Sequence, residues 1–580
     1  MPSITRSSSS TSHPNKPQSL SNSPSASSLN LHPAPSSTSV TPDPADPHDE
    51  TKFKQLLAVL KKAIGVKDMG AMRLSLPAHL ITPVGNLEYW CYLDRPDFFA
   101  AINDSDDDFE RMLAVLRWTL TKDCKFVHGP ICKPYNSVLG EQFRCIYDVI
   151  PAKVDPDSGE LLVFDTPSRA ASPTNPADST CKRSASFRTT SSSTALDSED
   201  PGPLRDENRS PSSLATSVNN KPSRSARVVF LNEQVSHHPP ISCFWYEART
   251  KLEGQTPPSK PLVIAHGVDQ ISAKFTGTSV KVFPGSMNKG IFIKLPNRNE
   301  EYEITHPTAT VTGLIRANPY VVIADYAYIT CRSPQKRRFR AMINYLDEVS
   351  NSSSGAFSMY HMDQLAELYY CTPAPHQNNQ SWVGKAKFAL EGVIYELEET
   401  ENPNEWTKIK QVPSERIWCK FSGSWRGVVT YTMREQSRKS SGSNEQQSSS
   451  NKTRELLNLG NLFPLPKMVK PQEKQTEMES RKFWSSLTSL IEVKNFSEAT
   501  KVKQAIEQHQ RDLSTQRRNS NQPFKPLIFH IEDNDNSDND DNVPDPAKPT
   551  PDGYAKFSKP TLTPGGTTIL EAEFEGIGYN

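Results

Sequence analysis

The chain has 580 residues, of which 35% are hydrophobic and 48 are proline. The hydrophobic share stays below the roughly 45–50% of a typical globular domain, also when glycine is counted, so a large part of the chain does not belong to a packed core. The 66 basic and 66 acidic residues cancel, which excludes a broadly basic nucleic-acid-binding protein.

Four segments have too few apolar residues to offset the entropy of ordering. Residues 1–50 hold 15 serines and 9 prolines and are predicted to form a disordered tail. Serine-rich tracts at about 151–227 and 434–452 are predicted to be disordered inserts. The end of the chain, 532–580, is predicted to be an acidic and proline-rich tail. One folded domain is therefore expected over 51–531.

The first folded segment opens with a short basic amphipathic helix at 51–64. Its apolar residues recur three or four positions apart, and its lysines lie largely elsewhere. A mobile cover and a helix packed in the core both fit this pattern. A second helix is predicted over 106–121, where aspartates at the start favour the helix dipole. The apolar face of the first helix consists of Phe53, Leu56, Leu57, Leu60 and Ile64.

The middle of the chain changes to short strand-like runs, most of them separated by Gly, Pro or Asn. Many strands at such spacing predict a β-sandwich or barrel, and a barrel of this many strands can enclose a ligand cavity. Helices are predicted again over 479–493 and 497–518. The strand-like runs are 228–236, 241–248, 262–275, 279–283, 290–295, 302–306, 309–315, 320–331, 388–397 and 427–433.

The most unusual motif is EQVSHHPP at 233–240. Pro239 restricts His238 to extended conformations, which predicts two imidazoles held at the end of a strand. A metal site would need a local kink and further ligands. Catalysis by Ser236 would need a nucleophile elbow, and no GxSxG occurs in the chain. Imidazoles can also bind anions, and hydrogen bonds to backbone carbonyls would give the histidines a structural role.

EQVSHHPP resembles the signature of the oxysterol-binding protein family of lipid-transfer proteins. Further segments resemble family motifs in the family's order: LPAHLITPVGNLEYW at 76–90, KPYNSVLGEQF at 133–143, ESRKFW at 479–484 and KQAIEQHQR at 503–511, with FKPLIF at 524–529 as a weaker match. The resemblance implies an α+β, β-dominated fold. In it, a near-complete antiparallel β-barrel encloses a hydrophobic tunnel, with an N-terminal lid helix at 51–64 and flanking helices.

The resemblance also implies a site for the headgroup of phosphatidylinositol 4-phosphate. In the helix over 497–518, three charged residues are spaced four apart and share one face. A surface stripe with one ion pair fits the same spacing. Ser137 replaces the family's proline, which predicts a less rigid loop. The implied headgroup residues are Lys133, Asn136, His237, His238, Lys503, Glu507 and Arg511.

The function that the resemblance implies is non-enzymatic exchange of phosphatidylinositol 4-phosphate for a second lipid between membranes, with no catalytic residue, metal or other cofactor. Sterol is favoured as the second lipid, because 76–90 does not match a phosphatidylserine-type pattern near LEPxSxLE. A phosphatidylserine exchanger, a lipid sensor or scaffold, and a hydrolase using Ser236 remain alternatives. The expected partners are lipids and membrane surfaces, and no nucleic acid.

The expected location is the cytoplasm, with transient peripheral contact with membranes at a contact site. The N-terminus has no apolar signal segment, no apolar run reaches the ~18 residues of a membrane span, and nine cysteines occur without a CxxC pair. Asp97, Phe98 and Phe99 faintly resemble a motif that endoplasmic-reticulum receptors bind. Their place inside a predicted helix favours a buried position in the core.

Overall fold

The computed structural model describes most of the predicted folded segments and little of the predicted inserts. The described residues are 78, 81–129, 133–155, 160–163, 225–251, 260–313, 320–333, 337–346, 388–398, 402–434, 453–522, 524–530 and 559–579. The predicted lid helix and the tail at 1–50 lie outside the described residues, so both stay predictions. No described helix is long and apolar enough to cross a membrane.

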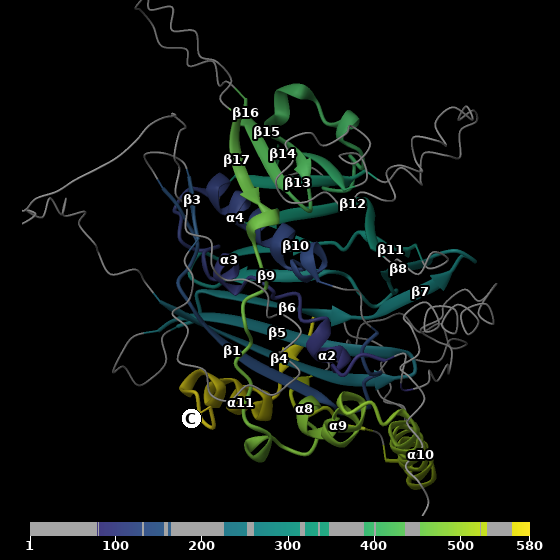
Figure 1. Cartoon of the computed structure of the whole chain (residues 1–580). Coiled ribbons are helices and arrows are strands. Elements are labelled where there is room, and N and C mark those ends of the chain that lie inside the picture. The colour runs from purple at the N-terminus through teal and green to yellow at the C-terminus, as the bar shows by residue number, and fades with distance from the viewer. Residues whose placement is uncertain are drawn as a thin grey trace, which may run out of the picture. The chain divides into compact units, whose positions relative to one another are not determined.

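One antiparallel sheet forms the main part of the described chain (Figure 1). Three short strands, β7 (Ile271–Phe275), β8 (Val280–Pro284) and β11 (Thr308–Thr312), join it where β11 pairs with β12. The other neighbouring strands are, in spatial order, β1 (Gln142–Val149), β4 (Ala226–His237), β5 (Pro240–Thr250), β6 (Val263–Asp269), β9 (Ile291–Leu295), β10 (Glu300–Ile304), β12 (Tyr320–Arg332), β13 (Arg338–Tyr345), β14 (Ala389–Leu397), β15 (Ile417–Ser424), β16 (Val428–Met433) and β17 (Thr453–Asn458).

The two faces of the sheet pack against different parts of the chain. Successive side chains of a strand point to opposite faces. In β13, Phe339, Ala341 and Ile343 are buried in the main hydrophobic cluster, whereas Met342 belongs to a separate cluster on the other face. The predicted β-dominated fold with a large antiparallel sheet is thereby confirmed. The hydrophobic tunnel stays a prediction.

Two helices lie against the inner face of the sheet. Phe99 of α3 (Pro96–Ala100) and Trp118 of α4 (Asp108–Thr121) are fully buried in the main cluster together with inward side chains of the strands. α4 confirms the helix predicted over 106–121. Eleven of its 14 residues are buried, so the helix is enclosed on nearly all sides.

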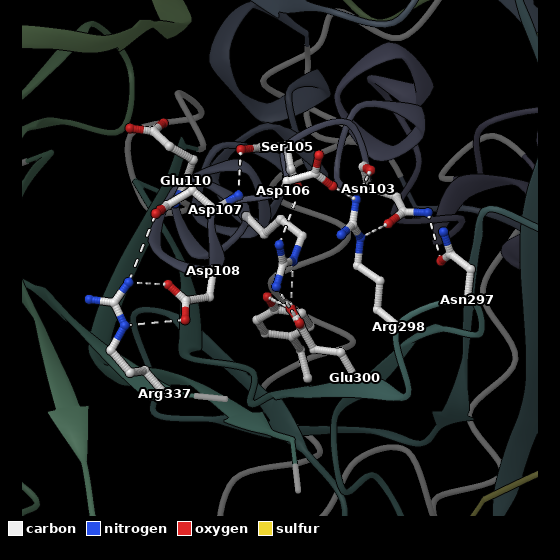
Figure 2. Close-up of polar contacts among 12 residues, drawn as sticks. Asn103, Ser105, Asp106, Asp107, Asp108, Glu110, Asn297, Arg298, Glu300 and Arg337 are labelled. Carbon is white, nitrogen blue, oxygen red and sulfur yellow. Dashed lines mark hydrogen bonds and ion pairs between the residues drawn. The ribbon is translucent and has the colours of Figure 1, made fainter. Parts of the chain in front are cut away.

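Charged contacts fix the start of α4 against the strands (Figure 2). The side chain of Asp107 caps the helix by accepting from a backbone N–H in the first turn, at 2.9 Å. Arg337 donates to Asp108 at 2.8 Å, and the fully buried Arg111 donates two hydrogen bonds to the carboxylate of Glu300. These contacts tie the helix to the start of β10, where Glu300 lies, and to the start of β13 (Arg338–Tyr345), which Arg337 precedes.

The predicted C-terminal helices are confirmed. The segment 479–493 forms α8 (Ser480–Phe483) and α9 (Ser485–Glu492), and the next segment forms α10 (Phe496–Ser520). Two further short helices are α2 (Asn86–Tyr89) and α5 (Lys125–His128).

Two predicted boundaries need correction. The insert expected to begin at 151 instead starts with a hairpin of β2 (Lys153–Val154) and β3 (Leu161–Leu162), and β3 contacts β17. The predicted end of the domain at 531 is too early, because α11 (Pro564–Glu575) packs on β1 and β4 with Leu570 and Phe574 buried. Apolar burial outweighs the acidic and proline-rich composition there.

Candidate functional site

His237 and His238 lie at the tip of the hairpin formed by β4 and β5. His237 ends β4 and pairs with Pro240, the first residue of β5, so His238 and Pro239 form the turn. The His238–Pro239 peptide bond is cis. The two imidazole rings lie 4.4 Å apart, with His237 partly buried and His238 exposed. The predicted position at the end of a strand is confirmed.

The loop over 133–141 runs beside the base of this turn. The N–H of Gly140 donates to the carbonyl of Gln234 at 2.9 Å, and the N–H of Gln234 donates to the carbonyl of Glu141 at 2.8 Å. Within the loop, Nζ of Lys133 donates to Oδ1 of Asn136 at 2.9 Å, and both residues are exposed. The structure thus brings the KPYNSVLGE and EQVSHHPP motifs side by side.

Glu141 holds this loop against the segment that carries ESRKFW. Its buried carboxylate accepts from the hydroxyl of Ser480 at 2.6 Å, from the indole N–H of Trp484 at 3.0 Å and from the N–H of Val138 at 3.0 Å. Burial raises the pKa of the Glu141 carboxyl to about 7, although these three donors act in the opposite direction. Sequence reasoning missed this residue.

The start of α10 packs beside the same loop. Tyr135 and Val138 of the loop share a hydrophobic cluster with Ala499 of α10, and Val502 and Ile506 pack against it. Since residues three and four apart lie on one side of a helix, the charged residues next to this apolar stripe project near the loop. The cluster therefore places α10 and the loop next to each other.

The predicted charged face of α10 is paired within the helix. Lys503 and Glu507 form an ion pair, and Arg511 lies 3.9 Å from the Glu507 carboxylate. Lys503 is 13% exposed and Arg511 is 59% exposed, so only the second presents most of its side chain to solvent. Backbone hydrogen bonds link the loop over 133–141 to the base of the histidine turn, and a hydrophobic cluster links the same loop to α10. The roles of all seven residues in headgroup binding stay predictions.

Glu233, the first residue of the histidine motif, binds the FKPLIF segment. Its buried carboxylate accepts from the backbone N–H groups of Leu527 and Ile528, each at 2.8 Å. Burial raises the pKa of Glu233 against the effect of these donors. Directly after this contact along the chain, β18 (Phe529–His530) pairs with β19 (Thr561–Leu562), and β19 is followed by α11. A motif read as ligand-binding thus also holds the C-terminal segment.

A second polar cluster lies in the interior of the sheet. The hydroxyl of Tyr92 and Nδ2 of Asn288 donate to Oδ1 of Asp269 at 3.1 and 3.2 Å. Nζ of Lys122 lies 5.1 Å from the centre of the Tyr92 ring, and the His306 ring lies 5.2 Å from it. Burial raises the pKa of Asp269 to about 7 and lowers the pKa of His306 to about 3. These polar residues were not singled out from the sequence.

Two sequence interpretations are decided by burial. Phe98 and Phe99 are at most 2% exposed and Asp97 pairs with Arg95, so these residues are part of the core, as their place in a helix favoured. Ser236 is buried within β4 and not on a sharp strand-to-helix turn. This segment therefore does not form a nucleophile elbow.

The sequence model of the oxysterol-binding protein family matches residues 55–370. Oxysterol-binding protein-like protein 1 of Schizosaccharomyces pombe is 36% identical over 558 residues, which cover 90% of this chain and 91% of that protein. Human oxysterol-binding protein-related protein 10 is 24% identical over 80% of this chain, and the match spans 44% of the human protein's length.

Solved structures give weaker matches. Osh1 ORD domain in complex with ergosterol has a TM-score of 0.47 and 16% identity, over 87% of this chain and 86% of that one. Osh3 ORD in complex with PI(4)P from Saccharomyces cerevisiae has a TM-score of 0.43 and 14% identity, over 82% of this chain and 87% of that one. The family match over more than half of the chain and the near full-length relative decide the assignment: the chain belongs to the oxysterol-binding protein family.

Proposed function

We propose that this protein exchanges phosphatidylinositol 4-phosphate for a sterol between membranes, without catalysing a reaction. The observation that carries the proposal is the joining of three elements at one place: the histidine turn, the loop over 133–141 and α10. Backbone hydrogen bonds link the first two, and a hydrophobic cluster links the last two. Elements so fixed can present several cations to one ligand.

The charges of these elements suit the inositol headgroup. A terminal phosphate carries about −2, and the bridging diester adds a further negative charge. Lys133, Lys503, Arg511 and the two histidines would donate charge-assisted hydrogen bonds to phosphate oxygens. Glu507 keeps the two cations of α10 in place, and Asn136 would bind an inositol hydroxyl.

The interior polar cluster favours sterol as the second lipid. A sterol has a single hydroxyl at the end of an apolar body, so it needs one small polar group inside an apolar space. The carboxylate of Asp269, which already accepts from the hydroxyl of Tyr92 at 3.1 Å, can also accept from a sterol hydroxyl, and Tyr92 belongs to the main hydrophobic core. Phosphatidylserine would bring a carboxylate, an ammonium and a phosphate, which are expensive to bury without matched partners. It remains the alternative second lipid.

The test replaces both histidines with alanine and measures the two lipids separately. We expect His237→Ala with His238→Ala to abolish extraction of phosphatidylinositol 4-phosphate from liposomes, while sterol binding and the melting temperature stay near wild type. Equal loss of both lipids at an unchanged melting temperature contradicts the headgroup assignment.

A matched pair of lysines on α10 sharpens this test. Lys503→Ala should weaken extraction of the phosphoinositide. Lys501→Ala removes a 70% exposed lysine from the same helix, where it pairs with Glu498 at 3.0 Å, and should leave extraction unchanged. Equal effects of the two variants would mean that general surface charge, and not the site, drives binding.

Two other functions make different predictions. A sensor or scaffold binds lipid but does not speed its movement from donor to acceptor liposomes, whereas an exchanger does. A hydrolase would release product from a labelled phospholipid, and the burial of Ser236 in β4 argues against this. We further propose transient peripheral contact with cytoplasmic membrane surfaces at contact sites. Because Phe98 and Phe99 are buried, they give no support to a receptor partner.

A further inference from the structure

Three short strands extend the main sheet at the end that carries the histidine turn. β5 begins directly after this turn, and Ser242 of β5 stands opposite Asp269, the last residue of β6. β7 begins two positions after Asp269, so it continues from this same end of the sheet. β7 pairs with β8, β8 pairs with β11, and β11 pairs with the first part of β12 (Figure 1). We call β7, β8 and β11 the small sheet.

The two faces of the small sheet differ in chemistry. Residues that stand opposite each other in neighbouring strands share a face, and successive residues of a strand alternate between faces. One face carries only apolar side chains in these strands. It lies on the side of the main core, because Ile323 of β12 continues this face and packs against the main cluster. The outer face consists of Ser272, Lys274, Lys281, Phe283, Thr308, Thr310 and Thr312.

Two lysines stand directly opposite each other on the outer face. Lys274 of β7 pairs in the sheet with Lys281 of β8, and like charges in such a pair repel each other. Both side chains are exposed to solvent, and Lys281 is 47% exposed. Nζ of Lys281 lies 3.9 Å from a carboxylate oxygen of Asp325, which is itself 56% exposed. An ion pair so exposed contributes little, so the pair of lysines keeps an excess of positive charge.

The sequence of the small sheet supplies no carboxylate that would neutralise these lysines. Residues 270–299, which include β7 and β8, hold five basic residues and no acidic residue. Residues 304–324, which include β11, also lack an acidic residue. The whole chain has 66 basic and 66 acidic residues, so the positive excess is local. A local excess of one sign attracts a partner of the opposite sign.

We propose that the outer face of the small sheet docks on the anionic surface of a lipid bilayer. The inference rests on the proposed function, because a headgroup that passes from a membrane to the histidine turn requires this end of the sheet to approach the membrane. Lys274 and Lys281 are attracted there by anionic headgroups. Phe283, which is partly buried on the same face, suits the boundary between headgroups and acyl chains, where aromatic side chains are favourable.

The experiment measures binding of the full chain to vesicles of phosphatidylcholine with and without phosphatidylglycerol. Neither lipid is proposed to be exchanged, so the assay reports docking alone. Wild type should bind more tightly when phosphatidylglycerol is present, and added salt should weaken that binding. Because each lysine near an anionic surface changes the affinity roughly fivefold, Lys274→Gln with Lys281→Gln should weaken binding to the anionic vesicles roughly 25-fold.

A matched control separates this surface from the general charge of the protein. Lys410→Gln with Lys420→Gln also removes two exposed lysines, but from the segment 402–416 and from β15, and should leave vesicle binding near wild type. Replacing Lys274 and Lys281 removes a repelling pair, so that variant should melt at or above wild type. It should also bind a water-soluble, short-chain phosphatidylinositol 4-phosphate as wild type does, because neither lysine is among the proposed headgroup residues.

Several outcomes contradict the proposal. Wild type that binds equally to both kinds of vesicle has no docking surface for anionic lipid. Equal vesicle binding by wild type and the Lys274 and Lys281 variant, or an equal loss in the control, places the contact elsewhere. If that variant melts well below wild type, the lysines support the fold instead, and if it loses only the binding of heparin, the surface takes a soluble polyanion.

Two further results separate docking from lipid exchange. Loss of the short-chain phosphatidylinositol 4-phosphate in the Lys274 and Lys281 variant would place these lysines in the headgroup site and contradict a separate docking surface. Wild type that fails to extract phosphatidylinositol 4-phosphate refutes the proposed exchange alone, because the docking vesicles contain none of that lipid. Failure of one proposal is therefore distinguishable from failure of the other.

Discussion

Glu233 and the histidines share one short motif, but replacing them should change different properties. Glu233 supports the stability of the fold, whereas the histidines are proposed to bind the headgroup. The Glu233 carboxylate is 1% exposed and accepts two backbone N–H groups, both at 2.8 Å. A hydrogen bond to a charged group contributes about 1.5–3 kcal/mol. Glu233→Ala should therefore lower the free energy of unfolding by roughly 3–6 kcal/mol, a large part of a typical total of about 5–15 kcal/mol.

The assay is urea unfolding of delipidated protein, followed by tryptophan fluorescence. Glu233→Gln keeps one carbonyl acceptor and should lose about half as much stability as Glu233→Ala. Glu301→Ala is the control, because it removes a 40% exposed carboxylate that pairs with Lys294 at 3.4 Å, and it should cost less than about 1 kcal/mol. A Glu233→Ala protein as stable as this control would refute the reasoning.

Three further predictions concern pH, the first insert and the lid. The folded-state pKa of Glu141 is raised from 4.5 to about 7, so its favourable contribution is present below about pH 4.5 and is lost as the pH rises toward 7. That loss amounts to roughly 3 kcal/mol, and Glu141→Gln should remove it from the pH dependence of urea unfolding. Replacing 166–222 with about ten Gly and Ser residues should leave the melting temperature and lipid extraction nearly unchanged, whereas a deletion that starts at 155 also removes β3 and should lower the melting temperature. If 51–64 is a movable lid, serines at three of its leucines should lower lipid retention and raise leakage while the empty protein melts near wild type; a core helix would instead lose about 2–5 kcal/mol per leucine. These leucines are Leu56, Leu57 and Leu60.

The fold could be predicted where apolar residues alternate cleanly, and it was missed where charged residues interrupt the pattern. Strands such as β5 and β12 were expected, but β13 was not, because Arg338 and Arg340 stand where an outward apolar residue would have revealed the period. α11 was missed because its first turn contains two glycines. Gly566 is needed there, since a Cβ would lie 2.2 Å from the carbonyl oxygen of Ile528.

The site could be predicted as a set of motifs but not as a set of contacts. The histidine turn follows from its prolines, and the charged face of α10 follows from helical spacing. Glu141 and Glu233 carry no such signal, because a buried carboxylate and an exposed one look the same in a sequence. Their role depends on donors more than 290 residues away along the chain, such as Leu527 for Glu233 and Ser480 for Glu141.

The contrast between motifs and contacts matters at Ser137, which stands where the family motif has a proline. A proline there would restrict the loop by fixing its own φ, and its absence predicted a less rigid loop. The structure supplies other restraints: Glu141 accepts from the N–H of Val138, and Gly140 donates to Gln234. Each restraint is a hydrogen bond to a buried group, which costs about 1–3 kcal/mol to leave unmade. The carboxylate of Glu141 can therefore hold the loop beside the histidine turn without the proline, and the position of Lys133 depends on Glu141 more than on residue 137.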